Sequence, residues 1–511
     1  MVVYAFEPFG FDGELVTVEV DLRRGIPSVD IVGLPDGAVK EARERIRAAV
    51  RNAGFEFPYD RLLISLAPAG VRKAGASFDL SMALAILLAS GQVACSARSA
   101  MVLGELELSG RVRAVHGVLP AVAAGLRAGV ERFIVPRPNL REAMVLAGDA
   151  ARALDSLADA IGLDGRPVEA PDGENLPSSD DGPSLADDVG DLSDIRGQDR
   201  LVRAMEVAAA GGHHLLLFGP PGSGKTMAAR RLPGILPDLD HDDSIAATKL
   251  HSLAGILPPS SGLVVRPPFR SPHHGASAEG VVGGGRSRRP GEISLAHGGV
   301  LFMDEAPEFR CDVLQSLREP LEEGCISIAR ADRTVRYPSV FMLVLACNPC
   351  PCGNLGRAAG VCLCSPNDLR KYWKKLGGPL LDRIDIRIPL RPARPEDLAA
   401  GPTVASQDAR TRVRAARARQ AVRYRGERFR LNGRLSPAAI ERHCMLEPTS
   451  RDYFVRLASR AGLSSRACHS VLRVARTIAD MEGAESMSSA HVEEAYELRR
   501  YGEDDPFWQV P

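Results

Sequence analysis

The stretch from Leu215 to Thr226, LLLFGPPGSGKT, constrains the fold of this 511-residue chain more than any other. The apolar run 215–218 predicts a buried parallel strand, which Gly219 breaks into a glycine-rich turn ending in Lys225 and Thr226. Glycines place no Cβ between the backbone N–H groups and a triphosphate, so such a turn can wrap phosphates closely. The sequence therefore predicts a phosphate-binding loop between a strand and a helix.

The residues of this loop have distinct expected roles. Lys225 is expected to reach the β and γ phosphates, and Thr226 to offer its hydroxyl to Mg²⁺. The helix that opens at Met227 directs its positive end at the nucleotide. The predicted cofactors are therefore ATP and Mg²⁺. The other residues expected to surround the phosphates are Gly219, Pro220, Pro221, Gly222, Ser223 and Gly224.

Two further apolar runs end in polar side chains. Val300–Glu305, VLFMDE, predicts a central strand that presents two carboxylates at its C-terminal end, where open parallel sheets bind ligands. We expect Asp304 to hold Mg²⁺ and Glu305 to polarise the attacking water. Val340–Ala346 predicts another buried strand, and Asn348 after it is the candidate for orienting that water.

Charge is unevenly distributed, although Lys plus Arg and Asp plus Glu both total 64. Residues 166–193 are rich in Pro, Gly, Ser and Asp, which predicts a flexible acidic linker. An acidic tail that mimics DNA and occludes a basic channel is the alternative. The N-terminus has no basic segment typical of a signal peptide, and no apolar run is long enough to span a bilayer. We expect a cytoplasmic protein with no membrane partner.

The first 165 residues predict an α+β domain, because strand-like alternation and helical spacing both occur there. Strands are expected at Leu15–Asp21, Arg61–Ala67 and Arg132–Val135, and helices at Asp36–Ala53 and Ser77–Leu88.

Three stretches of this domain, VDIVGLPDGAVKEARERIRAAV, GASFDLSMALAILLASG and LGELELSGRVRAVHGVLPAVAAG, resemble the YifB/ComM family of magnesium-chelatase-like AAA+ ATPases. The resemblance implies a multidomain α/β chain. It would comprise a Lon-protease-like domain (1–165), an AAA+ P-loop core with a parallel sheet (194–395) and a C-terminal helical lid (396–505).

The Lon-like domain raises the question of peptidase activity. Lon proteases use a serine activated by a lysine, and by the resemblance Ser77 lies near the serine position. Leu119 or Pro120 stands where the lysine is expected. We therefore expect an inactive scaffold in which Ser77 caps a helix.

Two segments flank the loop motif. Asp194–Ala210 predicts a helix, and the resemblance places Ile195 and Gly197 beside the adenine. The polar region Leu257–Gly299 resembles an insertion that projects into the pore of an AAA+ ring. Its arginines are expected to contact DNA phosphates: Arg286, Arg288 and Arg289.

The polar region also contains the adjacent histidines His273 and His274. Neighbouring residues of a strand point to opposite faces, so we do not expect this pair to chelate a metal.

Cys325–Tyr337 predicts a β-hairpin with Arg330 and Arg333 at its tip. It resembles a pore hairpin that grips a nucleic-acid backbone; an exposed hairpin kept soluble by its charges is the alternative. Arg410–Arg430 predicts a helix with a basic face, which suits either DNA contact or a solvated connection.

The segment CPCGNLGRAAGVCLC contains two Cys-x-Cys pairs that can reach one tetrahedral ion. Zinc is the metal expected for such a set, and free thiols in a packed loop are the alternative. The cysteines are Cys350, Cys352, Cys362 and Cys364.

Arg383, in GPLLDRIDIRI, resembles the arginine finger of AAA+ proteins. Such a finger stabilises γ-phosphate charge in the adjoining subunit, which implies a homo-oligomer, expected to be a hexameric ring. A surface pair between Asp382 and Arg383 is the alternative. In the helical region 437–500, Arg466 resembles the sensor that reaches the γ-phosphate, with Arg473 as the other candidate.

The resemblance implies an ATP-hydrolysing ring motor on single-stranded or branched DNA, a ComM-like helicase that promotes branch migration in natural transformation and recombination. Two alternatives stay open. One is a magnesium-chelatase-like motor for metal insertion, and the other is an ATPase scaffold with an inactive peptidase-like domain.

Overall fold

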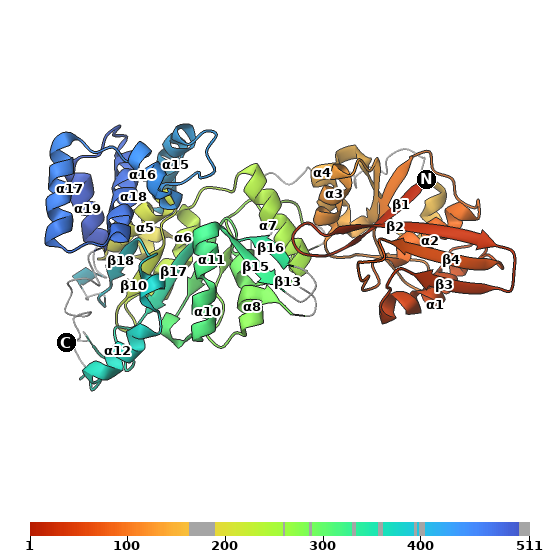
Figure 1. Cartoon of the computed structure of the whole chain (residues 1–511), viewed down its shortest axis with the longest axis horizontal. Helices are drawn as coiled ribbons and strands as arrows, with labels where there is room; N and C mark the ends of the chain where they lie inside the picture. The colour runs from red at the N-terminus through yellow and green to blue at the C-terminus, as the bar shows by residue number, and fades with distance from the viewer. Residues whose placement is uncertain are drawn as a thin grey trace.

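The computed structural model describes residues 1–162, 190–258, 261–285, 289–329, 334–355, 361–392, 396–397 and 404–499. The molecule is elongated, with the N-terminal domain at one end, a parallel sheet in the middle and helices at the other end (Figure 1). Among the described residues, no helix is both long and apolar enough to cross a membrane. Most of the expected linker 166–193 lies outside the described residues, as do Arg286, Arg288, Arg330 and Arg333.

The N-terminal domain is built on a mixed sheet of seven strands in the order β3-β4-β2-β1-β5-β8-β9. Its two central strands, β1 and β2, pair antiparallel, and β1 also pairs parallel with β5. The strands are β1 (Val2–Glu7), β2 (Glu14–Arg23), β3 (Ser28–Val32), β4 (Arg61–Ala67), β5 (Ser99–Val102), β8 (Arg132–Pro136) and β9 (Ala151–Leu154), with a small ladder of β6 (Glu105–Leu106) and β7 (Val112–Arg113).

Helices complete this α+β domain: α1 (Gly37–Asn52), α2 (Asp79–Ala89), α3 (Val118–Arg127) and α4 (Leu140–Ala147). The carboxylate of Asp36 caps α1 by accepting the N–H of Val39 at 2.9 Å. The expected cap at Ser77 is wrong, since α2 begins two residues later and Phe78 is its N-cap, without a side-chain hydrogen bond.

The central sheet has five parallel strands in the order β11-β14-β17-β10-β18. Because the strands are parallel, their C-terminal ends meet at one edge, where the polar residues that follow them come together. The strands are β10 (Leu215–Phe218), β11 (Phe269–Arg270), β14 (Val300–Met303), β17 (Met342–Cys347) and β18 (Ile386–Pro389).

The helix expected from Asp194 begins later, at Asp199, because Asp191 caps a short turn over Leu192–Asp194. The expected polar loop 257–299 contains short elements of its own, since its Gly, Ser and Pro residues form turns between them. The helices of this part are α5 (Asp199–Gly211), α6 (Lys225–Ile235), α7 (His241–Ala254), α8 (Ala278–Val282), α9 (Glu292–Leu295), α10 (Cys311–Ser316), α11 (Arg318–Glu323), α12 (Pro366–Lys374) and α13 (Gly378–Leu381).

Two short antiparallel ladders lie beside the central sheet. The predicted hairpin consists of β15 (Cys325–Ala329) and β16 (Thr334–Pro338). A second ladder pairs β12 (Gly283–Gly284) with β13 (Arg289–Pro290). The two ladders are adjacent, since a Cβ added to Gly283 would lie 3.2 Å from Cδ1 of Ile328 in β15.

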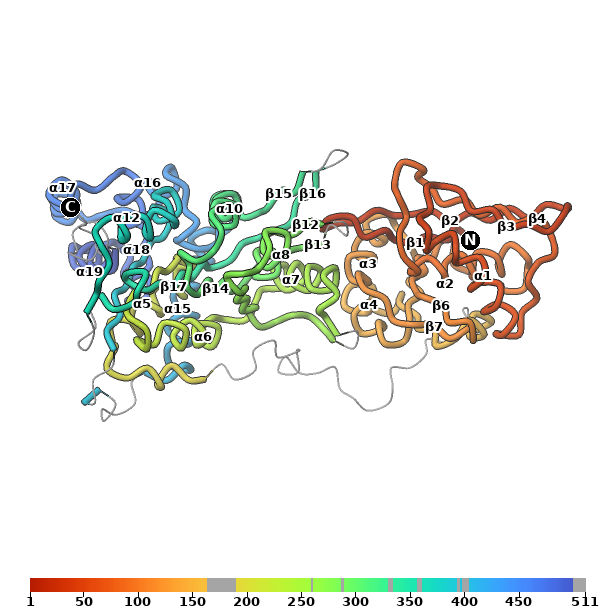
Figure 2. Tube along the Cα trace, turned by 90° about the horizontal axis from the view of Figure 1, so that it is seen from below, coloured from red at the N-terminus to blue at the C-terminus, as the bar shows by residue number. Residues whose placement is uncertain are grey.

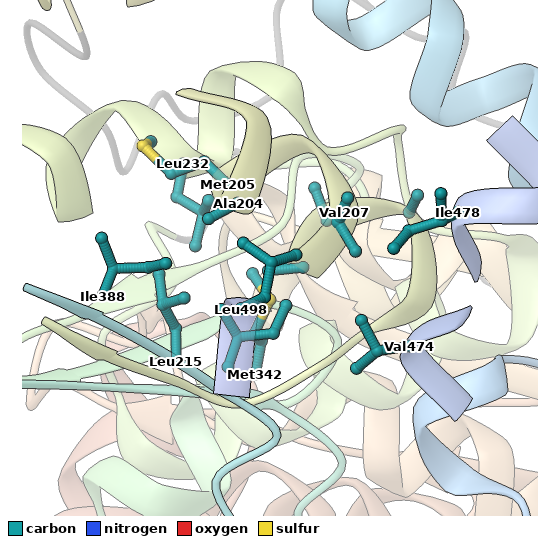
Figure 3. Packing of buried hydrophobic residues seen from close by; sticks show 14 of the residues in the cluster. Ala204, Met205, Val207, Leu215, Leu232, Met342, Ile388, Val474, Ile478 and Leu498 are labelled. Atoms are coloured by element: carbon teal, nitrogen blue, oxygen red, sulfur yellow. The ribbon is translucent and has the colours of Figure 1, made fainter. Parts of the chain in front are cut away.

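The C-terminal helices share one apolar core with the central sheet. Figure 3 shows Val474, Ile478 and Leu498 of these helices packed near Leu215 and Met342 of the sheet. This shared core ties the helices directly to the strand that precedes the phosphate loop. The helices are α15 (Ser406–Arg423), α16 (Pro437–His443), α17 (Pro448–Arg460), α18 (Ser465–Glu482) and α19 (Ser489–Arg499).

The arginine-rich helix α15 makes many contacts within the chain. Arg410 and Arg414 both pair with Asp238, at 2.6 and 3.0 Å. Arg417 donates to the carbonyl of Ala209, and Arg423 pairs with the buried Asp480. These contacts favour the connecting role of this segment over a free basic face for DNA.

Candidate active site

The phosphate loop connects β10 to α6 at the C-terminal edge of the sheet. Gly224 precedes α6 with a φ of 88°, a left-handed conformation that side chains rarely adopt. A Cβ on Gly219 would lie 2.4 Å from the carbonyl oxygen of Leu390, at the end of β18. Glycine is therefore required at both positions by the path of the loop.

Lys225 is held between the loop and the neighbouring strand. Its ammonium donates to the carbonyls of Gly219 (2.6 Å) and Pro220 (3.0 Å) and to Oδ1 of Asn348 (3.2 Å). Burial lowers the pKa of Lys225, and the negative charges of Asp304 and Glu305 oppose that change. The amide predicted to orient the lytic water thus lies against the lysine predicted to bind phosphate.

The two predicted magnesium ligands also meet. The hydroxyl of Thr226, in the first turn of α6, donates to Oδ2 of Asp304 at 2.7 Å. Asp304 directly follows β14, which is separated from β10 by β17 alone. A hydroxyl and a carboxylate are hard oxygen donors of the kind that Mg²⁺ binds, so the donor set fits that ion.

Glu305 has a strained backbone, with φ 51° and ψ 44°. Asp304 Oδ1 accepts the N–H of Glu305 at 3.0 Å and supports this left-handed conformation. Non-glycine residues in this region are uncommon and cluster at functional sites, where the surrounding structure holds them. The Glu305 side chain is 54% exposed, so water can reach the carboxylate predicted to polarise it.

His274 is a site residue that the sequence reasoning missed. Its Nδ1 lies 3.4 Å from Oε2 of Glu305. β11 ends at Arg270, so the two histidines lie in a turn, and their ring centroids are 4.1 Å apart. The expectation that they point to opposite faces is therefore wrong. The sequence held no signal for this contact, because the pairing of β11 with β14 is seen only in the fold.

We expect His274→Ala to lower kcat for ATP hydrolysis about ten-fold with little change in KM, because His274 contacts Glu305 and not the loop that holds phosphate. His274→Asn keeps a short polar side chain and should retain most of the rate. Steady-state ATPase measurements check this, with the exposed His241→Ala as control. A raised KM with normal kcat would contradict the role.

The residues expected beside the adenine, Ile195 and Gly197, differ in their surroundings. Ile195 is fully buried, and a Cβ on Gly197 would lie 2.3 Å from Cβ of Asp397. Gln198, which sequence reasoning did not single out, donates through Nε2 to the carbonyl of Ser223 at 3.2 Å. Adenine contact by Ile195 and Gly197 stays a prediction.

The two arginines predicted to reach a γ-phosphate, Arg383 after α13 and Arg466 in α18, meet at Glu322 of α11. Arg383 pairs with Glu322, and Nη2 of Arg466 lies 3.5 Å from Oε1 of the same carboxylate. Among the described residues, neither arginine has a polar contact with Lys225 or Asp304. The pair is therefore separate from the phosphate loop of its own chain.

Arg473, the other sensor candidate, belongs to a buried network. Its Nη2 lies 2.9 Å from Oδ1 of Asp385, and Nδ1 of His213 lies 2.9 Å from Oδ2. Burial alone would raise the pKa of Asp385, but Arg473 and His213 lower it well below its usual range. This network joins α18 to the segment before β18.

The four clustered cysteines converge. The sulfur of Cys350 lies 3.4 Å from that of Cys352 and 3.7 Å from that of Cys362, and all four Sγ atoms, including that of Cys364, lie within 4.8 Å of one another. A tetrahedral zinc with Zn–S bonds of about 2.3 Å places its sulfurs about 3.8 Å apart. The donor set therefore fits zinc. The cysteine loop packs against the phosphate loop, since a Cβ on Gly353 would lie 3.1 Å from Cγ of Pro221.

Two residues of the N-terminal domain, Leu119 and Lys73, bear on whether Ser77 has a neighbouring base. Leu119 is fully buried, and its backbone N–H donates to Glu142 at 2.9 Å. The buried Lys73 donates to the carbonyls of Gly33, Leu66 and Pro68, and burial lowers its pKa. Among the described contacts, nothing links either residue to Ser77.

Of the arginines expected to contact DNA, Arg289 alone lies in the described part of the chain. It is exposed in β13, beside the β15–β16 hairpin. The other four, Arg286, Arg288, Arg330 and Arg333, lie outside that part.

Comparison with known proteins gives similarity along nearly the whole chain. The family descriptions that match are "Subunit ChlI of Mg-chelatase" at residues 18–139, "Magnesium chelatase, subunit ChlI" at 191–398, and "Magnesium chelatase, subunit ChlI C-terminal" at 403–499.

Similar proteins include one from Mycobacterium tuberculosis described as uncharacterized, which is 42% identical over 504 residues, covering 96% of this chain and 97% of its own. YifB of Escherichia coli is 38% identical, covering 98% and 96%. Competence protein ComM of Haemophilus influenzae is 38% identical, covering 98% and 97%. A shorter match, 32% identical over 148 residues, is to Lon protease 2 of Bacillus subtilis, covering 26% of this chain and 25% of its own.

Proposed function

Because this chain belongs to the magnesium-chelatase-like AAA+ family that includes YifB and ComM, we propose that it is a ring-forming motor that hydrolyses ATP and acts on DNA. Membership of this family implies ATPase activity. The observation that carries the proposal is the meeting of Lys225, Thr226, Asp304 and Asn348 at one edge of the parallel sheet, with Glu305 beside them. We propose that its domains have the limits predicted from the sequence, which are 1–165, 194–395 and 396–505.

Each residue has a role in hydrolysis that follows from its contacts. Lys225 would exchange its carbonyl acceptors for β and γ phosphate oxygens, and Thr226 and Asp304 would hold Mg²⁺, which neutralises phosphate charge. Glu305 polarises the attacking water, and Asn348 orients it. Phosphoryl transfer needs positioning and charge stabilisation more than covalent help, and these side chains supply both.

The ring is supported by the position of Arg383 and Arg466. A guanidinium that neutralises γ-phosphate charge must reach a nucleotide, and both arginines are instead paired with Glu322 of their own chain. We therefore assign both to the nucleotide of the adjoining subunit, Arg383 as the finger and Arg466 beside it. Such a head-to-tail contact closes into a ring, for which we propose six subunits.

DNA is the partner that the two adjacent ladders fit best. Arg286, Arg288 and Arg289 occur in the sequence at the junction of β12 and β13, and Arg330 and Arg333 between β15 and β16. Phosphate contacts by arginine supply sequence-independent affinity. The relative from Haemophilus influenzae is named as a competence protein. We propose branch migration during natural transformation and recombination as the activity.

We expect single-stranded DNA to raise the ATPase rate several-fold, and Arg330→Ala with Arg333→Ala to abolish that stimulation while basal turnover survives. Steady-state ATPase titrations at fixed salt check this. Strand displacement on a branched substrate, with Lys225→Ala as control, tests the helicase activity itself. No response to DNA in either assay would remove DNA from the proposal and favour a metal-insertion motor.

We also propose that the four clustered cysteines bind zinc. Purified protein should then contain about one zinc per chain, and Cys352→Ser with Cys362→Ser should reduce it to background. Elemental analysis measures this, with Cys311→Ser, an exposed cysteine outside the cluster, as control. Less than about half a zinc per chain would reject the site.

A further inference from the structure

The loop between β1 and β2, residues 8–13, extends from the N-terminal domain to the ATPase part of the chain. Its red trace reaches the neighbourhood of α7 and β13 in both views (Figures 1 and 2). Phe9 and Phe11 pack against an apolar cluster that contains Leu250 of α7 and Val335 of β16. At Gly10 the approach is so close that a Cβ would lie 2.5 Å from Cγ1 of Val335.

Charged groups at this contact pair across the two domains. Nζ of Lys249, on α7, lies 3.3 Å from Oδ1 of Asp12 and 3.9 Å from the ring centroid of Phe11. Arg127 of α3 pairs with the same carboxylate at 3.0 Å. Burial alone would raise the pKa of Asp12, but Lys249 and Arg127 lower it. Asp12 therefore joins α7 to α3.

A second, more buried contact lies one turn further along α7. The hydroxyl of Ser252 donates to Oε1 of Glu142 at 2.5 Å and accepts the N–H of Gly117 at 3.0 Å. Glu142 is almost fully buried, and burial raises its pKa, against the hydrogen bonds donated by Ser252, Asn139 and the N–H of Leu119. A buried carboxylate satisfied partly by the other domain ties the two domains in one arrangement.

The elements held in this way, α7 and β16, adjoin the segments expected to touch DNA. β16 is the returning strand of the hairpin, and Arg330 and Arg333 lie in the sequence between its two strands. α7 is joined through His251 to Leu295 of α9, at the end of the inserted region, by a contact of 3.0 Å. A two-stranded hairpin is marginally stable alone and needs packing to hold its position.

We infer that the N-terminal domain braces the base of the hairpin and the end of α7, so that engagement of DNA at the hairpin is transmitted to the ATPase core. This role rests on the DNA motor proposed above. A hairpin whose Val335 is packed against Gly10 and the Phe11 cluster loses less conformational freedom when DNA binds. Lys249 and Ser252 hold α7, in the same cluster, to the N-terminal domain. The domain then acts as a support, which needs no peptidase chemistry.

The test uses full-length protein that carries both Phe11→Ala and Lys249→Met. The first substitution removes the aromatic ring, and the second removes the charge of Lys249 while methionine keeps an unbranched apolar side chain. Hydrogen exchange in the C-terminal half of α7 and in β16 should become about ten-fold faster. Basal ATPase should be unchanged, and the DNA-stimulated increment should fall to about a third or less. Asp12→Asn, a milder change, should give a smaller shift in the same direction.

The exposed Tyr59→Ala of the N-terminal domain is the matched control and should leave exchange and stimulation as in the wild type. Unchanged exchange in the double variant would overturn the brace, and faster exchange with full stimulation would overturn the coupling. If DNA does not stimulate the wild type, the coupling fails together with the proposed function. The exchange experiment then still decides whether the domain holds the hairpin.

Discussion

Replacing Lys225 with alanine should lower the ATPase rate by about a hundred-fold or more. The ammonium hydrogen-bonds to the loop carbonyls of Gly219 and Pro220 and to the amide of Asn348. Among the described residues, no other lysine or arginine hydrogen-bonds to these three groups. Its loss removes the positive charge that stabilises the transferring phosphoryl group.

Two controls isolate the chemical effect of this change. Lys374→Ala, an exposed lysine of α12, should hydrolyse ATP at the wild-type rate. Thermal unfolding of Lys225→Ala should show a folded protein, because a buried cation is being removed and no cavity opens in the apolar core. A variant that folds normally and hydrolyses ATP at the wild-type rate would remove this loop from the site.

Replacing Arg383 with alanine should lower the rate about a thousand-fold, because an arginine finger supplies charge stabilisation at the transition state. The lost activity should be recoverable when a neighbouring subunit in the ring supplies an intact Arg383. Mixing Lys225→Ala subunits with Arg383→Ala subunits should restore about a quarter of the wild-type rate, because that share of randomly formed interfaces pairs an intact loop with an intact finger.

The mixing experiment separates action between subunits from action within one subunit. If Arg383 served its own nucleotide, no mixed ring would contain a complete site, and the rate would stay as low as in either variant alone. Glu322→Gln is the control for the ion pair that Arg383 makes in its own chain. That variant should keep its activity, since Glu322 is assigned no part in hydrolysis.

Local patterns predicted several elements well. The predicted strand at Arg61–Ala67 is β4 with the same limits, and the predicted hairpin is β15 and β16. Alternation and turn residues act over a few neighbours, so a short window contains the necessary information. The start of α5 was misplaced because the cap of the preceding turn is Asp191, and the side chain of that residue also accepts the N–H of Ser406.

The sequence by itself predicted which residues form the nucleotide site and which cysteines form the cluster. The four cysteines share one short loop, and each polar group of the nucleotide site follows its own apolar run, so both sets could be named from local patterns. The sheet then brings Asp304 to Thr226 across 78 positions and Asn348 to Lys225 across 123. Only the tertiary structure decided that His274 meets Glu305, that Arg383 and Arg466 share Glu322, and that Ser252 meets Glu142 across 110 positions. Such contacts form when whole elements pack together, and no local pattern encodes which distant faces will meet.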